Sequence, residues 1–141
     1  IQPGKPLAFG RARAPDGREV LLFGLPGNPV SSFVTFELFV RPVVRRLGGR
    51  RDGSGRAIIR ARMADDASVD PARRGFLRVT LEPSSGGLPV ARLSGGQGSH
   101  MLSALAASDG LAVVPEGMGR VQAGAELEVI RLDELPGVVV A

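Results

Sequence analysis

The sequence predicts two consecutive pieces of different fold class: an α/β piece over residues 1–50 and a small all-β, barrel-like piece over residues 51–141. Three observations support this division. In the first piece, an apolar run leads through a Pro-Gly-Asn-Pro turn into a helical pattern. In the second, short strand-like runs alternate with turn residues. A polar, Gly-rich stretch at residues 50–56 lies between them and is typical of a domain boundary.

The first piece contains one predicted strand and one predicted helix. Residues 20–25 are apolar without alternation, which favours a strand buried on both faces, as in the parallel sheet of an α/β domain. Asn28 suits the N-cap of the following helix and Pro29 its first position. Pro42 predicts a kink because it has no N–H to donate, and a Gly-Gly pair predicts the helix end. The apolar positions expected on the buried helix face are Phe33, Phe36, Val40, Val43, Val44 and Leu47.

The second piece contains five predicted strands, separated by turn residues rich in Asp, Pro, Ser and Gly. The strands are expected at residues 57–63, 76–82, 88–93, 111–114 and 126–132. Short strands at this spacing predict a small barrel or sandwich. One helix is expected over residues 100–107, with Ser99 as a candidate N-cap.

The composition narrows the class of protein. Cysteine is absent, which excludes disulfides, thiolate zinc sites and thiol catalysis, and the single histidine, His100, excludes His-rich metal cages. No apolar run reaches the roughly 18 residues of a membrane span, and no secretory leader opens the chain, so we expect a cytoplasmic protein without a membrane partner. The chain begins at Ile1 rather than Met, which indicates part of a longer protein.

The charge is unevenly distributed along the chain. Residues 41–78 carry a net charge of +7 and residues 79–141 a net charge of −4. A basic segment in a chain with a pI near 11.1 would suit a nucleic-acid-binding module. However, this segment holds only one phenylalanine, and the chain has no Trp or Tyr on which bases could stack. Biased composition explains the arginines equally well, and no nucleic-acid partner is expected.

The strongest candidate site is the turn between the predicted strand and helix of the first piece. Gly27 allows the backbone to approach a ligand, and the N–H groups of Val30, Ser31 and Ser32 lie at the positive end of the helix dipole. Two serine hydroxyls add donors for an anion. The spacing is not that of a phosphate-binding P-loop. An ordinary strand-to-helix connection is the alternative.

Two further segments have the chemistry of an oxyanion site. Lys5, the only lysine, stands in a stiff Pro-Gly-Lys-Pro turn and offers a compact positive charge. Residues 94–100 are Gly-rich and contain Ser99, which could bind an anion or act only as a helix N-cap. Ser99 beside His100 does not indicate a hydrolase, because the sequence has no Gly-x-Ser-x-Gly elbow.

Charged residues of the second piece give weaker signals. Asp65, Asp66 and Asp70 have side chains that bind divalent ions, but they lack the spacing of a calcium loop, and a solvated loop is the simpler interpretation. Arg78 lies near the start of a predicted strand, from which it could point into a cleft.

Together these motifs resemble one family. Residues 2–6 (QPGKP) and 25–31 (LPGNPVS) are similar to the end of the molybdopterin-binding α/β domain of the molybdopterin molybdenumtransferases, the MoeA/gephyrin E-domain family. Residues 57–141 resemble that family's C-terminal β-barrel domain, including GGQGSH at residues 95–100 and VQAGAELEV at residues 121–129. The resemblance covers nearly the whole chain in collinear order, so the chain is identified as a C-terminal fragment of such an enzyme.

This resemblance implies an activity, partners and a cofactor. The whole enzyme inserts molybdenum from molybdate into adenylylated molybdopterin with the help of Mg²⁺, and it is a homodimer whose site is shared between subunits. The Mg²⁺ ligands are expected upstream of Ile1, so we expect no metal site in this fragment and no turnover by the fragment alone. A non-catalytic binding or scaffolding relative is the alternative. Gln2, where many members have lysine, is the one residue in its favour.

The resemblance also assigns substrate-binding positions, although it identifies no catalytic residue. Lys5, Pro6 and Ser31 match molybdate-site positions. The loop at the pterin site is matched by Pro26, Gly27, Asn28 and Pro29. Arg78 and Ser99 match the arginine and serine contributed by the C-terminal domain. Cations, hydroxyls and helix N–H groups suit a dianionic oxyanion and a phosphorylated pterin.

Overall fold

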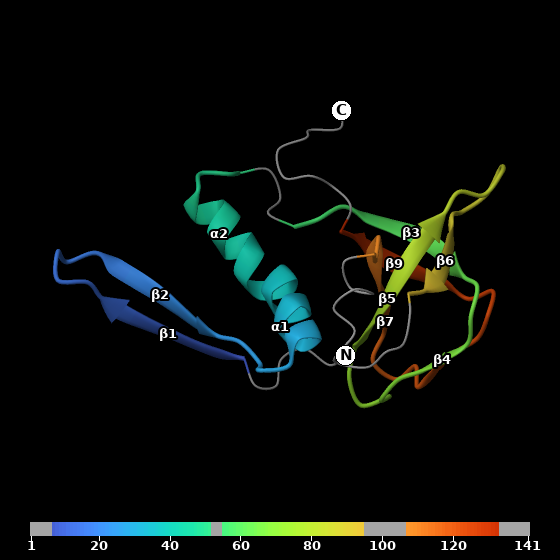
Figure 1. Ribbon diagram of the computed structural model, residues 1–141, viewed down its shortest axis with the longest axis horizontal. Helices are drawn as coiled ribbons and strands as arrows, with labels where there is room; N and C mark the ends of the chain where they lie inside the picture. Colours follow the sequence, from blue (N-terminus) through green and yellow to red (C-terminus); the bar gives the residue numbers. More distant parts are fainter. Residues whose placement is uncertain (1–6, 52–54, 95–106, 133–141) are drawn as a thin grey trace. The chain divides into compact units, whose positions relative to one another are not determined.

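The computed structural model describes residues 7–51, 55–94 and 107–132 (Figure 1). The chain divides into two compact units, Gln2–Gly55 and Arg56–Ala141. The first unit contains a two-stranded hairpin followed by a helix, and the second contains a closed five-stranded barrel. None of the helices in the described residues is long and apolar enough to cross a membrane.

The hairpin consists of β1 (Ala8–Arg13) and β2 (Glu19–Gly24), which pair in antiparallel orientation. Its turn contains Pro15-Asp16-Gly17, with Gly17 in the left-handed region at a φ of 86°. The predicted parallel strand, buried on both faces, is therefore wrong: β2 pairs with the segment before it, and Leu22 is 52% exposed. An apolar run favours an extended strand, but it specifies neither the partner nor the direction of pairing.

A single continuous helix follows, in which a π-helical turn separates two α-helical parts. The parts are α1 (Pro29–Thr35), η1 (Phe36–Val40) and α2 (Arg41–Leu47). The Arg41 N–H donates to the carbonyl of Phe36, five residues earlier. Because Pro42 donates no hydrogen bond, the wider π turn lies where a normal α-helical ladder would be broken. The irregularity predicted at Pro42 thus takes the form of a π turn.

The buried face of this helix differs from the predicted one. Val34 and Thr35 are buried, and so is Glu37, whose carboxylate lies 3.7 Å from the Arg41 guanidinium. None of the six predicted core positions is fully buried: Phe36, Val44 and Leu47 are exposed, and Phe33, Val40 and Val43 are partly buried. The apolar repeat predicts which helix face is buried, but in the structure a neighbouring face is buried instead. On that face the ion pair of Glu37 with Arg41 offsets the cost of burying the Glu37 carboxylate.

The second unit is a barrel whose strands match the five predicted ones. They are β3 (Ile58–Met63), β5 (Gly75–Glu82), β6 (Val90–Leu93), β7 (Gly110–Val114) and β9 (Glu126–Arg131). The strands close in the order β3-β6-β5-β7-β9, with β3 and β6 parallel and the other pairs antiparallel. The predicted small barrel is confirmed. Two short strands, β4 (Ala67–Ser68) and β8 (Arg120–Val121), pair beside it.

Alternate residues of each strand fill the barrel interior. The buried core consists of Ala61, Met63, Leu77, Val79, Ala91, Ala112, Val114, Val121, Leu127 and Val129. Burying a side chain of the size of leucine or valine contributes about 1.5–3 kcal/mol. Gly110 lies so close to this core that a Cβ atom there would come within 2.5 Å of the Val129 side chain.

Strand β5 changes partners in its middle. Its first half pairs with β7, from Gly75 to Val79, and its second half pairs with β6, from Val79 to Glu82. Both neighbouring strands therefore have an end opposite Val79. At this position the chain leaves β6 on one flank of β5 and enters β7 on the other (Figure 1).

Candidate functional site

The Pro-Gly-Asn-Pro turn lies between β2 and α1, with Pro26 buried and the next three residues exposed. The side-chain oxygen of Asn28 accepts hydrogen bonds from the N–H of Val30 at 3.1 Å and of Ser31 at 3.3 Å. The backbone carbonyl of Asn28 accepts the N–H of Ser32 at 2.8 Å. Asn28 is thus the N-cap of α1, as predicted.

These bonds correct the expectation that the helix start offers free N–H groups to an anion. All three N–H groups already have an acceptor in Asn28, because an asparagine N-cap supplies the negative partial charge that the helix start attracts. Gly27 retains its predicted property. A Cβ atom at Gly27 would meet no atom within 4 Å, so this exposed backbone can be approached from outside.

Arg78 lies in β5 on the outer face of the barrel, since its neighbours Leu77 and Val79 point into the core. Its side chain is nevertheless completely buried, as is that of Leu111, its cross-strand partner. Burial lowers the pKa of the Arg78 guanidinium, because desolvation disfavours the charged form. Arg78 does interact with other groups of the chain. Burial of the charged guanidinium carries a desolvation cost, which the interactions of Arg78 must offset.

The backbone around Arg78 is held by hydrogen bonds from both neighbouring strands' ends. The N–H of Ser94, which follows β6, donates to the carbonyl of Arg78 at 3.0 Å. The N–H of Asp109, which precedes β7, donates to the carbonyl of Val79 at 2.9 Å. The two ends of the stretch between Ser94 and Asp109 are thus anchored on consecutive residues of β5. Ser99 belongs to this stretch but lies outside the described residues, as do Lys5 and Pro6.

The predicted site residues that the structure describes fall into two groups. Residues 26–31 belong to the first unit, and Arg78 belongs to the second. Asp109, whose N–H binds the carbonyl next to Arg78, is not among the predicted site residues, and Asp65 is considered there only as a ligand for a divalent ion. In the sequence, the pair Asp109-Gly110 indicates only a turn.

The aspartates considered for a divalent ion serve as acceptors for backbone N–H groups. Asp65 accepts the N–H of Leu93 at 2.9 Å, and Asp66 accepts that of Ala123 at 2.7 Å. Asp70 accepts the N–H of a residue in its own turn at 2.9 Å. In the described parts of the chain, no three His, Cys, Asp or Glu side chains come together as a metal site. These residues therefore do not fit Mg²⁺.

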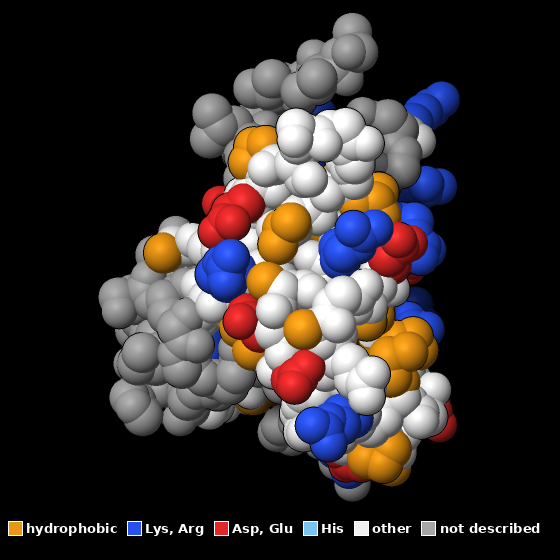
Figure 2. All heavy atoms as spheres, turned by 90° about the vertical axis from the view of Figure 1, so that its right-hand side faces the viewer, with side chains coloured by type: hydrophobic (Ala, Val, Ile, Leu, Met, Phe, Trp, Pro, Cys, Tyr) orange, Lys and Arg blue, Asp and Glu red, His pale blue; other side chains and the backbone are white. Residues whose placement is uncertain are grey.

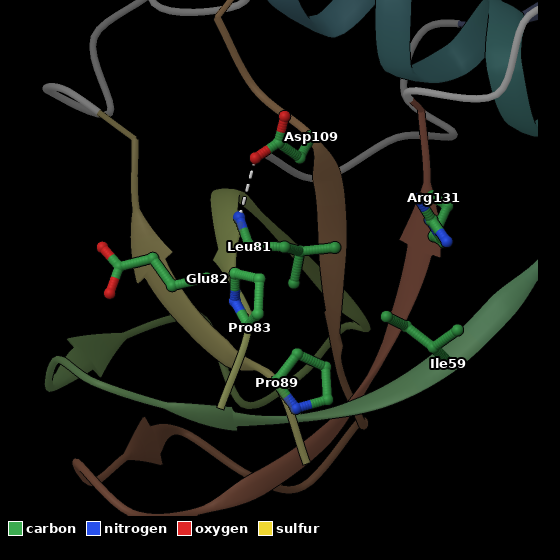
Figure 3. A pocket seen from close by; sticks show the side chains of 7 residues that line it. All are labelled: Ile59, Leu81, Glu82, Pro83, Pro89, Asp109 and Arg131. Atoms are coloured by element: carbon green, nitrogen blue, oxygen red, sulfur yellow. Dashed lines mark hydrogen bonds between the residues drawn. The ribbon is translucent and has the colours of Figure 1, made fainter. Parts of the chain in front are cut away.

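A pocket of about 420 Å³ lies at one end of the barrel, where strand ends meet (Figure 3). Its described lining is Ile59, Leu81, Glu82, Pro83, Pro89, Asp109 and Arg131. Ile59 and Leu81 pack against the core beneath it. The Asp109 carboxylate is fixed at its edge by the N–H of Leu81 at 2.8 Å. The predicted substrate-binding residues that the structure describes do not line this pocket.

Charges on the barrel surface are mixed. On the face shown in Figure 2, basic and acidic side chains lie interspersed with single apolar ones. Arg60 and Arg62 both lie 3.5 Å from the Glu126 carboxylate, and Arg92 lies 3.1 Å from that of Glu82. Arg60 and Arg62 of the basic segment are thus paired with an acid, an arrangement that does not favour binding to a polyanion.

The family model of the MoeA C-terminal region (domain IV) matches residues 60–132, which are 73 of the 141 residues. The chain belongs to this family. The match falls on the barrel, so the barrel is the MoeA domain IV fold, and the predicted family membership is confirmed.

Full-length relatives support the same family membership. Molybdopterin molybdenumtransferase of Nostoc sp. is 33% identical over 132 residues, covering 94% of this chain and 30% of the relative. Molybdopterin molybdenumtransferase 1 of Mycobacterium tuberculosis is 37% identical over 134 residues, covering 92% of this chain and 30% of the relative. The chain therefore spans about 30% of the length of these relatives, which are proteins of molybdenum cofactor biosynthesis.

A solved MoeA structure agrees with the sequence relatives. The molybdopterin biosynthesis MoeA protein of Pyrococcus horikoshii superposes with a TM-score of 0.67 at 32% identity. The superposition covers 95% of this chain and 30% of that protein.

Proposed function

We propose that this chain is the C-terminal part of a molybdopterin molybdenumtransferase, which inserts molybdenum from molybdate into adenylylated molybdopterin. On this proposal residues 1–50 end the α/β molybdopterin-binding domain, and residues 51–141 are the C-terminal β-barrel domain. The whole enzyme is a cytoplasmic homodimer with a site shared between subunits. The observation that carries the proposal is Arg78, a cation buried on the outer face of a barrel of the MoeA family.

The proposed role of Arg78 follows from its chemistry. Molybdate is a dianion, and a guanidinium offers it several N–H donors in a fixed plane. In a buried position, this attraction is weakened less by water than it is at the surface. Ser99 would add a hydroxyl donor. Lys5 and Ser31 would bind molybdate from the α/β side, with Pro6 shaping the turn that carries the lysine.

The turn at residues 26–29 has a different proposed role. Gly27 is exposed and has no side chain, so a pterin phosphate can come close to its backbone. Pro26 is buried and Pro29 begins the helix, which keeps the turn in one conformation. Asn28 holds the helix start with its side chain and would offer the ligand its remaining amide donors.

Magnesium belongs to another part of the proposed enzyme. Mg²⁺ would neutralise charge on the adenylate when bound. The described residues do not provide a set of ligands for it. The role proposed for this chain is therefore to bind and orient the two substrates.

A chimera tests the proposal. This chain would replace the matching 30% of the Nostoc relative, and the chimera would be expressed in a bacterium that lacks its own molybdenumtransferase. We expect molybdoenzyme activity to return, and to be lost in Arg78→Ala and Ser99→Ala. Arg120→Ala is the control, because Arg120 is exposed and lies in the short strand β8.

Two outcomes would reject parts of this proposal. A folded, dimeric chimera without activity would reject the transferase function and favour a binding or scaffolding relative. Full activity at low molybdate in both alanine variants would reject the site assignment and leave the family membership unchanged.

A further inference from the structure

The structure contains two aspartates that continue β-ladders at the positions where the partner strand has ended. Parallel pairing of β3 with β6 reaches Met63 and Ala91, and beyond it the Asp65 carboxylate accepts the N–H of Leu93 at 2.9 Å. Pairing of β5 with β7 stops at Gly110, and beyond it the Asp109 carboxylate accepts the N–H of Leu81 at 2.8 Å. A side-chain oxygen replaces a main-chain carbonyl in both places.

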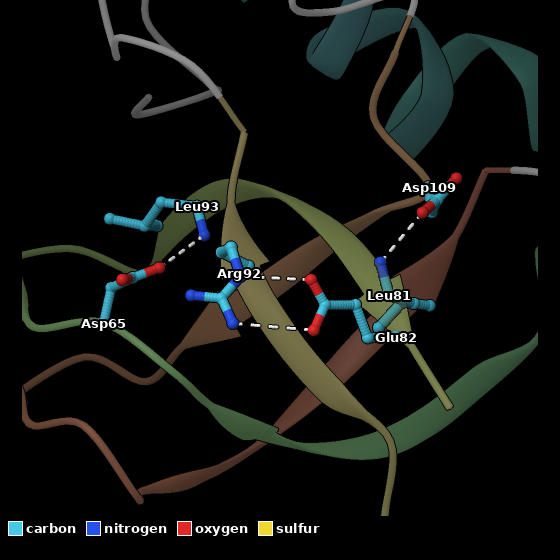
Figure 4. A network of polar contacts seen from close by, with 6 residues as sticks. All are labelled: Asp65, Leu81, Glu82, Arg92, Leu93 and Asp109. Carbon is cyan, nitrogen blue, oxygen red and sulfur yellow. Dashed lines mark hydrogen bonds and ion pairs between the residues drawn. The ribbon is translucent and has the colours of Figure 1, made fainter. Parts of the chain in front are cut away.

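Figure 4 shows the two replacements: Asp65 binds Leu93 of β6, the neighbour of β5 on one side, and Asp109 binds Leu81 of β5 itself. Leu93, which Asp65 holds, directly precedes Ser94, whose N–H is bound to the Arg78 carbonyl. Asp109 itself binds the next carbonyl, that of Val79, through its own N–H. Asp65 therefore holds Leu93, and the adjacent Ser94 binds the backbone of Arg78. Asp109 holds β5 at two points, with its carboxylate at Leu81 and with its N–H at Val79, the residue after Arg78.

Asp109 is the more constrained of the two, because its side chain and both of its main-chain groups bind different parts of the barrel. Its carboxylate holds Leu81, its N–H holds Val79, and its carbonyl accepts the N–H of Leu132 at 2.8 Å. The second half of β5 and the end of β9 thus meet at Asp109. On the other flank, the ion pair of Arg92 with Glu82 ties β6 to β5 from the outside.

We infer that Asp65 and Asp109 are positioning residues for Arg78, which hold its strand so that the guanidinium stays in the orientation that binds the oxyanion. This inference rests on the proposed function for the identity of the anion. A buried side chain has its direction set by its backbone and by the packing around it. Loss of either carboxylate leaves the N–H of Leu93 or of Leu81 without this acceptor and allows this part of β5 to move. The movement weakens binding of the anion more than it slows the chemical step.

The chain offers a matched control for this inference. Asp66 is adjacent to Asp65 and accepts a backbone N–H in the same way, at 2.7 Å, but its partner is Ala123 in the turn before β9. Asp66→Ala removes the same kind of hydrogen bond without touching the flanks of β5. A further control is the asparagine variant, since Asp109→Asn and Asp65→Asn retain an oxygen that accepts the N–H.

The kinetic experiment uses the chimera described above. Asp65→Ala and Asp109→Ala should raise the KM for molybdate about ten- to hundredfold, with a smaller change in kcat and an unchanged KM for adenylylated molybdopterin. Asp66→Ala should leave the KM for molybdate unchanged. Asp65→Asn and Asp109→Asn should have the KM of the unsubstituted chimera, in contrast to the two alanine variants. An equal rise in Asp66→Ala, or no restoration by asparagine, would overturn the inference.

A second measurement separates this inference from the proposed function. In the 141-residue chain, amide hydrogen exchange should accelerate at Leu93 and Ser94 in Asp65→Ala, at Leu81 in Asp109→Ala, and at Ala123 in Asp66→Ala. Exchange at Ser94 and Leu81 that is the same in all three variants would contradict the positioning role even if the chimera were inactive. An inactive chimera with the expected exchange pattern would reject only the molybdate assignment.

Discussion

Arg78 and Leu111 pair across β5 and β7 on the outer face of the barrel, and neither side chain is exposed to solvent. An outward-facing position of a small barrel is normally solvated, so this pair marks a part of the barrel wall that is covered. The apolar side chain of Leu111 suits a buried position, whereas Arg78 carries a charge that burial disfavours. The difference makes Arg78 the residue of this pair that calls for a functional explanation.

The first prediction concerns the stability contributed by Arg78. Arg78→Ala should lower the free energy of unfolding by about 2–5 kcal/mol, because it removes a fully buried side chain together with its interactions. Arg78→Lys retains the charge and much of the apolar stem, so it should cost less. Urea unfolding measures both. A loss no greater than that of Arg120→Ala, an exposed arginine, would show that Arg78 contributes little to stability.

The second prediction concerns the tight contact at the start of β7. Gly110→Ala would place a Cβ atom 2.5 Å from the Val129 side chain and 3.0 Å from the Ile130 carbonyl oxygen. Relief of this overlap should cost about 1–3 kcal/mol of stability. Gly87→Ala is the control, since the nearest atom there is 3.9 Å away. Thermal unfolding of the two variants should differ clearly, and equal melting temperatures would show that the barrel adjusts without cost.

The third prediction concerns Asn28 as the N-cap of α1. Asn28→Ala removes the acceptor of two N–H groups and should destabilise the chain by about 1 kcal/mol, measured by urea unfolding. Asn28→Asp keeps the acceptor and should be neutral or slightly stabilising at a helix start. Asn28→Ala with unchanged stability would mean that water satisfies these N–H groups equally well.

The fourth prediction tests Gly27 as a point of close approach. Gly27→Ala meets open space in the protein, so its stability should stay within about 0.5 kcal/mol of the original. In the chimera, the added methyl group should raise the KM for adenylylated molybdopterin. Unchanged kinetics together with unchanged stability would remove Gly27 from the proposed pterin site.

The fifth prediction concerns pH and the hairpin turn. The N–H and guanidinium of Arg18 bind the Asp16 carboxylate and lower its pKa below the usual 3.8. A lowered pKa in the folded state means that this carboxylate stabilises the turn above its unfolded pKa. The contribution is lost as the pH falls through the folded pKa. An NMR titration of the Asp16 side chain should give a midpoint below 3.8 in the chain and a higher one in Arg18→Ala.

The barrel could be predicted from the sequence because its strands are short runs separated by turn residues, as at residues 83–87 between β5 and β6. Such runs identify strands but not their partners, so the parallel pairing of β3 with β6 could not be derived. The short strands β4 and β8 have two residues each, too few to show a period.

The first unit was harder to predict for a different physical reason. Strand β1 carries arginines and small residues, such as Gly10 and Ala12, and shows no clear apolar pattern. The Pro-Asp-Gly sequence of its turn was the available signal for a hairpin. Likewise, Asn28 predicted a helix start, but whether its oxygen would occupy the N–H groups or leave them to a ligand depended on side-chain geometry.

Closure of the barrel joins its first strand to its last. Ile58 of β3 pairs with Ile130 of β9, and four further pairs follow. The core of this unit therefore cannot be sealed during synthesis until Arg131 has been added and β9 is free to join. Until then β3 has an open edge, and a chain that stalls before β9 is complete presents this edge to other chains. Folding of this unit should therefore follow completion of β9, with association through the β3 edge as the competing process until then.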